Sequence, residues 1–293
     1  MSRILITGSK GQLGSDLVEW FSDTSYDVIG FSHEMLNVAD KGKVMEVVRS
    51  ERPNWILNCA AFTDLDKAEI NDNKALEVNF QGTKNLAEAC EELDIGMLHI
   101  STDAVYASTE PNYFETTDQP RPINRYGISK LMGEQAIKEI SSRYWILRSS
   151  WIYGQHGSKF FNSILRNISN SEDVEVVSDQ FGQPSPTIFL YSAILEILDD
   201  KIPSGMHHLV PRQFVSRFDF ALMIKQSYES VSGLTSNSKI IPTTTVKRTD
   251  VAPRAKYSLL SPSPDFEQIA DFPTSIHDQI RETIHRRERK KFA

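Results

Sequence analysis

The chain has 293 residues, of which 40% are hydrophobic and 24% are charged, and its formal net charge is −7 at pH 7. These values are typical of a soluble globular protein with a large core, built as one large α/β domain or two interleaved lobes. The negative charge argues against a general nucleic-acid binder or a membrane-surface protein. Two cysteines provide neither a disulfide framework nor a metal-ligand cluster, and there is no secretory signal, so we expect a reduced cytoplasmic protein.

Apolar runs and helical patterns alternate through about the first 200 residues. Strand-like runs are found at 3–7, 26–31, 55–62, 96–101, 144–150 and 174–179. Helical patterns lie between them, and residues 73–93 are expected to form one long helix. This alternation predicts an α/β fold with a doubly wound parallel sheet of the Rossmann type, covered by helices on both faces.

The composition changes in the later part of the chain. Residues 232–254 are rich in Ser, Thr and Pro, which is typical of either a flexible connection or a loop shaped by a ligand. We therefore expect a dinucleotide-binding domain over 1–155, to which later segments return. A smaller, interleaved C-terminal lobe is expected over 156–293.

The stretch TGSKGQLG places glycines at positions 8, 11 and 14, directly after the first strand and at the start of a helix. Glycines in this context allow a tight turn and let the backbone approach a pyrophosphate at the helix N-terminus. Glycine-rich turns occur elsewhere, but the strand, turn and helix together favour a dinucleotide fingerprint.

Two further motifs follow in order. The motif STD, Ser101 to Asp103, stands at the end of the strand GMLHIS, at the edge of a parallel sheet where ligands bind, although a strand-end cap would use the same residues. Tyr126 and Lys130 lie four positions apart, so they share one face of a helix. A nearby ammonium would lower the pKa of Tyr126 toward the working range of a general acid.

With these motifs the chain resembles the extended short-chain dehydrogenase/reductases, and within them the dTDP-4-dehydrorhamnose reductase family. The resemblance rests on ILITGSKGQLG, NCAAFTDLDKAE, STDAVY, YGISKLMGE, ILRSSWIYG, SDQFGQPS, GMHHLV and APRAKYSLLS, spread over residues 4 to 261. It implies a nicotinamide cofactor, a nucleotide-sugar substrate whose 4-keto group is reduced, and a C-terminal lobe that binds this substrate.

The resemblance also implies roles for particular residues. Thr102, Tyr126 and Lys130 would form the catalytic triad, with Tyr126 as the proton donor. The expected cofactor-binding residues are Gly8, Lys10, Gly11, Gln12, Leu13, Gly14, Ser32, Ala60, Ala61, Thr63, Tyr126 and Lys130. The expected substrate-binding residues are Asp103, Val105, Trp151, Lys159 and Arg254, of which Lys159 and Arg254 would lie near the diphosphate.

The end of the second strand carries the prediction of cofactor preference. An NAD-selective fold usually has an acid there to bind the ribose 2′-hydroxyl, whereas this chain has Ser32. Ser32 and Lys10 could both contact a 2′-phosphate, while Glu34 would weaken this contact if it turned inward. The sequence therefore predicts NADPH as the cofactor, used at least as well as NADH.

The chain departs from the family pattern in the expected substrate lobe. Lys159 precedes Phe160 where Asn is common, and the RPxNS motif appears as residues 254–258, RAKYS. Some relatives dimerise around a magnesium ion through acidic residues, and one of these positions is Ile188 here. We therefore predict no metal, leave a homodimer open, and take His207 and His208 as structural residues rather than ligands.

Two alternatives remain from the sequence alone. An epimerase or dehydratase of the same superfamily would share the glycine loop and the Tyr-x-x-x-Lys pair, but would hold its cofactor tightly and catalyse no net oxidation. A non-catalytic regulatory subunit, like the reductase-like protein that serves methionine adenosyltransferase, would bind a larger partner and show no turnover.

Overall fold

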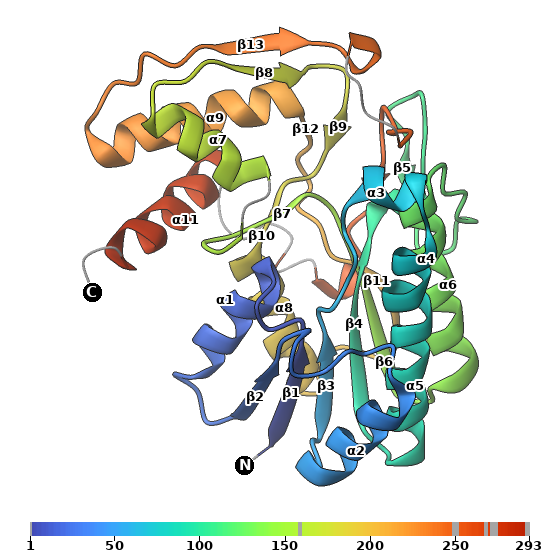
Figure 1. The fold of residues 1–293 in the computed structure, drawn as a ribbon. Helices are drawn as coiled ribbons and strands as arrows, with labels where there is room; N and C mark the ends of the chain where they lie inside the picture. The colour runs from blue at the N-terminus through green and yellow to red at the C-terminus, as the bar shows by residue number, and fades with distance from the viewer. Residues whose placement is uncertain (1, 158–159, 248–251, 267–268, 270–274, 291–293) are drawn as a thin grey trace.

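The computed structural model describes residues 2–157, 160–247, 252–266, 269 and 275–290. A central sheet is covered by helices on both faces, and a smaller lobe of helices and short strands lies beyond one end of it (Figure 1). The arrangement confirms the predicted α/β class and the Rossmann-type sheet.

The central sheet contains six strands, and every neighbouring pair is parallel. The spatial order is β2-β1-β3-β4-β6-β11, so the direction of winding reverses between β1 and β3. In an open parallel sheet, ligands bind beyond the carboxyl ends of the strands at such a reversal. The strands are β1 (Arg3–Thr7), β2 (Asp27–Phe31), β3 (Trp55–Asn58), β4 (Gly96–Thr102), β6 (Tyr144–Ser149) and β11 (Gly205–His208).

Alternate residues of the strands build two separate cores. Ile4 and Ile6 face one core with α1 (Gln12–Phe21) and α8 (Thr187–Leu198), while Leu5 faces the other. The second core contains α2 (Lys41–Glu51), α5 (Thr83–Glu92) and α6 (Arg125–Ile140). Since successive side chains of a strand point to opposite faces, an apolar run buries both faces of the sheet.

One predicted strand lies outside this sheet. Residues 174–179 contain β8 (Val174–Val177), which pairs in parallel with β13 (Ile240–Thr243) in the smaller lobe. The sixth strand of the central sheet is β11, whose sequence GMHH contains no β-branched residue. Hydrophobic runs indicate strands, but they do not say which sheet a strand joins, because pairing depends on the path of the chain between strands.

The smaller lobe has its own core, formed by α7 (Phe160–Ser169), α9 (Arg217–Ser232), α11 (Ile276–Lys290) and the β8–β13 pair. Three short pairs complete the described strands: β7 (Ile152–Tyr153) with β10 (Ser185–Pro186), β9 (Phe181–Gly182) with β12 (Val215–Ser216), and β5 (Tyr113–Phe114) with β14 (Leu259–Leu260). Within the described residues, no helix is long and apolar enough to cross a membrane.

The predicted helix over 73–93 forms as three consecutive helical segments, of which the middle one is π-helical. It consists of α4 (Asn73–Ala75), the π-helical segment η1 (Leu76–Gly82) and α5. Within the π segment, the Asn79 amide donates to the Phe62 carbonyl and accepts from the Phe62 N–H. These two hydrogen bonds fix the loop that follows β3. Segments of π-helix are often found beside functional sites.

Candidate active site

The turn after β1 depends on glycine at two positions. Gly8 has φ of +65°, and a Cβ there would lie 2.8 Å from the backbone of Cys59 and Ala60. A Cβ on Gly14 would lie 2.3 Å from the Gly8 carbonyl oxygen. Gly14 lines neither neighbouring cavity, so its contribution is close packing of α1 on the turn rather than the direct cofactor contact we expected.

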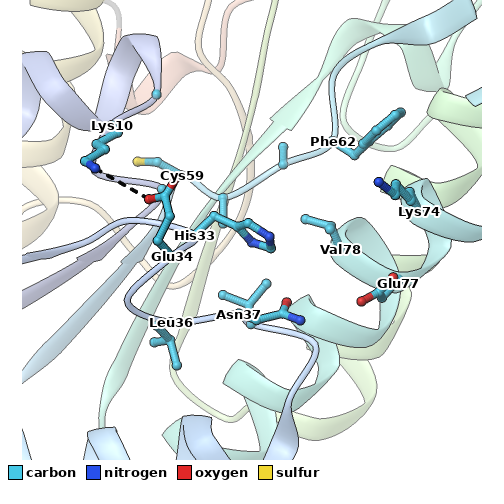
Figure 2. A pocket seen from close by; sticks show the side chains of 15 residues that line it. Lys10, His33, Glu34, Leu36, Asn37, Cys59, Phe62, Lys74, Glu77 and Val78 are labelled. Carbon is cyan, nitrogen blue, oxygen red and sulfur yellow. Dashed lines mark ion pairs between the residues drawn. The ribbon is translucent and has the colours of Figure 1, made fainter. Parts of the chain in front are cut away.

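A cavity of about 480 Å³ lies beyond the carboxyl ends of β1, β2 and β3 (Figure 2). One wall comes from the glycine turn and the end of β2, and the opposite wall comes from the 60–62 loop and the start of the long helix. Its lining residues are Gly8, Lys10, Gly11, His33, Glu34, Leu36, Asn37, Val38, Cys59, Ala60, Ala61, Phe62, Lys74, Glu77 and Val78. Apolar side chains facing each other across a cavity of this size suit the adenosine half of a dinucleotide.

The Ser32 hydroxyl, just after β2, is already engaged within the protein, which differs from our expectation that it could contact a 2′-phosphate. This hydroxyl is buried and donates to Glu34 Oε2 at 2.5 Å. Lys10 Nζ lies 3.6 Å from the same carboxylate oxygen (Figure 2). The hydrogen bond from Ser32, together with the charge of Lys10, holds the pKa of Glu34 below its usual range. An acid therefore does stand at this strand end, two residues later than the position we considered.

A second cavity, of about 450 Å³, continues from the glycine loop to the carboxyl ends of β4 and β6. Thr102, Tyr126 and Lys130 all line it, so the fold brings the three predicted catalytic residues together. It is lined by Lys10, Gly11, Gln12, Leu13, Cys59, Ala61, Thr63, Ile100, Ser101, Thr102, Asp103, Tyr126, Lys130, Ser149, Trp151, Ile152 and Gly157.

Small residues let α6 reach this cavity. Asn124 caps the helix by accepting from the Gly127 N–H at 2.8 Å, which starts α6 just before Tyr126. A Cβ on Gly127 would lie 2.3 Å from the Ala104 carbonyl oxygen, and one on Gly133 would lie 2.3 Å from that of Asn79. Any larger residue at either glycine would push the helix, and Tyr126 with it, away from the sheet.

Burial dominates the protonation of Tyr126. It raises the pKa of Tyr126 to about 12, while a hydrogen bond with Thr102 opposes the rise and the Asp103 carboxylate adds to it. We expected Lys130 to lower this pKa, and that expectation is wrong for this structure, because Lys130 Nζ is directed elsewhere. A phenol with a raised pKa keeps its proton at neutral pH, which is the state that a proton donor requires.

Lys130 is buried and held by groups of β4. Its Nζ donates to the Ile100 carbonyl oxygen at 2.7 Å and lies 3.0 Å from His99 Nε2. Burial lowers the pKa of Lys130 to about 8, and the neighbouring Glu134 opposes this effect. Burial and the charge of Lys130 hold the pKa of His99 well below its usual range, so His99 is neutral.

A buried ion pair supports the catalytic helix from behind. Arg148 donates to both carboxylate oxygens of Glu134, at 2.9 and 2.6 Å, and Ser101 donates to the same carboxylate at 2.5 Å. These bonds join α6 to β6 and to the residue before Thr102. Removing one partner from such a buried pair costs about 3–5 kcal/mol, so this network fixes the position of α6 on the sheet.

A third cavity, of about 300 Å³, shares Thr102, Asp103, Tyr126 and Trp151 with the second. Ser258 and Ser150 donate to Asp103 Oδ2 at 2.5 and 2.9 Å, yet burial still raises the pKa of this carboxyl group. The remaining lining residues come from both lobes: Leu65, Ala104, Tyr106, Ile123, Asn124, Gln180, Phe181, Arg217, Arg254, Ala255 and Ser258.

Of three further residues expected to bind the substrate, one is placed differently, one is not described, and one lines the third cavity. Val105 is fully buried in a core cluster with Tyr106, Val210 and Leu260, and it does not line the third cavity, because the 3-10 turn after Thr102 points it inward. Lys159 lies outside the described residues. Arg254 lines the cavity and pairs with Asp66 at 3.0 Å.

Several cavity residues were not among the predicted site residues. Glu34 was considered only as a residue that would weaken contact with a 2′-phosphate, and it does line the first cavity. Arg217 follows Ser216, which caps α9 by accepting from the Asp219 N–H at 2.9 Å, so the pattern S-x-x-D marked the helix start. Nothing local indicated that this helix would begin at the cavity.

Comparison with known proteins agrees with the Rossmann-type fold. The family model described as RmlD substrate binding domain matches residues 1–288. The dTDP-4-dehydrorhamnose reductase of Aggregatibacter actinomycetemcomitans is 34% identical over 76% of this chain and 78% of that protein. The spore coat polysaccharide biosynthesis protein SpsK of Bacillus subtilis is 31% identical over 98% of each chain.

Among solved structures, the dTDP-4-dehydrorhamnose reductase of Bacillus anthracis in complex with NADP is similar with a TM-score of 0.87 and 31% identity. The match covers 98% of this chain and 100% of that one. Fold and matches together define an NAD(P)H-dependent oxidoreductase. More narrowly, the chain belongs to the dTDP-4-dehydrorhamnose reductase family.

Proposed function

We propose that this protein reduces the 4-keto group of a dTDP-linked 6-deoxy sugar, with NADPH as the cofactor and Tyr126 as the proton donor. The observation that carries the proposal is the continuity of the three cavities. A site suited to a dinucleotide leads directly to Thr102, Tyr126 and Lys130, and the same residues open into a cavity lined by both lobes.

The residues present fit a nicotinamide dinucleotide. Gly8 and Gly11 line the first cavity, and Gly11 is the N-cap of α1, whose first N–H groups attract anions. The matched B. anthracis enzyme was solved with NADP, which supports the choice of cofactor. When bound, the reduced nicotinamide supplies the hydride.

The protein's own residues hold the carbonyl group and supply the proton. Thr102 and Tyr126 line the same cavity, where both hydroxyls can bind the oxygen of the keto group. As the carbonyl oxygen gains negative charge, Tyr126 donates its phenolic proton to that oxygen. Lys130, which lines the same cavity, would donate a hydrogen bond to the nicotinamide ribose of the cofactor.

A panel of 4-keto nucleotide sugars tests this proposal. The protein is mixed with NADPH and each compound, and the loss of NADPH absorbance is followed. We expect net oxidation of NADPH with a dTDP-linked 4-keto-6-deoxy sugar, and a strongly reduced rate with Tyr126→Phe. Cofactor that stays bound through purification, with no net oxidation for any member of the panel, would instead indicate an epimerase or dehydratase.

A further inference from the structure

The third cavity must accept an anion if the proposed function is right, although the chain as a whole carries a charge of −7. Two arginine side chains line this cavity: Arg254, from the segment that starts at residue 252, and Arg217, at the start of α9. Arg254 Nη2 pairs with Asp66 Oδ1 at 3.0 Å.

Arg217 is held by aromatic rings. Its guanidinium carbon lies 3.6 Å from the centre of the Trp151 ring and 4.9 Å from that of Phe160. Its backbone N–H donates to the Gln180 carbonyl oxygen at 3.0 Å, which ties the start of α9 to the cavity wall. A guanidinium stacked on a ring face is held in one orientation, and its N–H donors remain available at its edge for bidentate binding of phosphate oxygens.

Trp151 is held in turn by its surroundings. Its φ of +44° lies in the left-handed region, which is unfavourable for a residue with a bulky side chain. A Cβ on Gly182 would lie 2.3 to 2.7 Å from the Trp151 ring, so only glycine leaves space for the ring there. Strained residues of this kind persist where the surroundings fix them, and they cluster at ligand sites.

We propose that Arg217 is a specificity-determining residue that binds the diphosphate of the nucleotide sugar, with Trp151 as the platform that orients its guanidinium. The proposal rests on the proposed function and names a contact within the same site. Asp103, which borders the catalytic hydroxyls, lies close enough for Arg217 to act on its carboxylate electrostatically. A phosphate bound by Arg217 would therefore lie near the reacting sugar rather than at the outer rim.

The competing explanation is that Arg217 only clamps Trp151 in place. Both explanations predict weaker substrate binding in Arg217→Ala, so the substrate KM alone does not separate them. The number of phosphates on the ligand does separate them. A diphosphate contact makes the protein prefer dTDP over dTMP, whereas a clamp would support both nucleotides equally.

The experiment measures dissociation constants of dTDP and dTMP for the full chain saturated with NADP⁺, by isothermal titration calorimetry. We expect Arg217→Ala to reduce the preference for dTDP over dTMP by about tenfold or more, the scale of a lost hydrogen bond between charged groups. Arg217→Lys keeps the charge but not the planar stack, so it should retain part of the preference. Arg281→Ala is the control, because Arg281 is an arginine of the same lobe that pairs with Asp278 on α11.

An unchanged preference for dTDP in Arg217→Ala, with both nucleotides weakened equally, would overturn the diphosphate contact in favour of the clamp. A wild-type protein that binds dTDP no better than dTMP would also overturn it. Failure of the proposed function is distinguishable from both results. In that case NADPH would not be oxidised with any keto sugar, whether or not Arg217 governs nucleotide binding.

Discussion

The Lys10–Glu34 pair gives the sharpest prediction about the cofactor. Glu34 accepts from Ser32 and lies 3.6 Å from Lys10, so it occupies both groups that could contact a 2′-phosphate. With NADH the same carboxylate can instead accept from the ribose hydroxyls. Glu34→Gln removes the charge that repels a phosphate, and it also weakens the acceptor for those hydroxyls.

The size of the effect follows from exposure. The side chains of Lys10 and Glu34 are 75% and 69% exposed, so solvent screens each charge, and single exposed ion pairs change equilibria by at most about fivefold. Glu34→Gln acts in opposite directions on the two cofactors, so the factors multiply. We expect the ratio of kcat/KM for NADPH to kcat/KM for NADH to rise about tenfold, and Lys10→Ala to lower it about threefold to fivefold.

The assay is steady-state kinetics with each cofactor at low ionic strength, since salt weakens exposed charge interactions. Glu46→Gln is the matched control, because Glu46 is 67% exposed and pairs with Lys43 at 2.6 Å on α2, outside the cavities. A ratio in Glu34→Gln that stays within twofold of the wild type would refute the role of Glu34. A tenfold preference of the wild type for NADH would show that NADPH is not the main cofactor.

Four other tests probe the site. Tyr126→Phe should reduce turnover by at least about a hundredfold while the dissociation constant of NADPH stays nearly unchanged, and turnover within a few-fold of the wild type would remove Tyr126 from the acid role. Because the pKa of Lys130 is lowered to about 8, its ammonium is present below that pH and lost above it. The free-enzyme profile of kcat/KM should therefore fall as pH rises through about 8, and a flat profile to pH 10 would contradict this. Replacing Arg254 or Lys159 with Ala should raise the substrate KM more than it lowers kcat, and an unchanged KM in both variants would place them outside the diphosphate site. Gly182→Ala should displace the neighbouring indole and lower kcat/KM for the sugar nucleotide, with NADPH affinity as the control that should not change.

The fold was largely predictable because its signals are local. Runs such as RILIT and WILNCAAF are apolar throughout, as buried parallel strands require, and the glycine turn marks where the first strand meets its helix. The assignment of strands to sheets was less predictable. Residues 174–177 and 205–208 both form strands, but only contacts between distant segments decide which one joins the central sheet.

The candidate site was predictable where residues follow strand ends. Thr102 and Asp103 were found in this way, and Tyr126 with Lys130 follows from helical spacing. Val105 was misplaced because one residue along a tight turn reverses the direction of a side chain. Arg217 was missed because its relation to Trp151 is tertiary: 66 positions separate the two residues, and only the folded chain stacks them. The direction of the Tyr126 pKa was misjudged because burial cannot be read from spacing.

The most direct test of the central claim follows the hydride itself. NADPH deuterated at C4 of the nicotinamide is incubated with the protein and a dTDP-linked 4-keto-6-deoxy sugar, and the product is analysed by NMR and mass spectrometry. The proposed reaction predicts one deuterium, bound to C4 of the sugar, for each NADPH oxidised. A product without deuterium, or with deuterium on another carbon, would contradict hydride transfer to the 4-keto group.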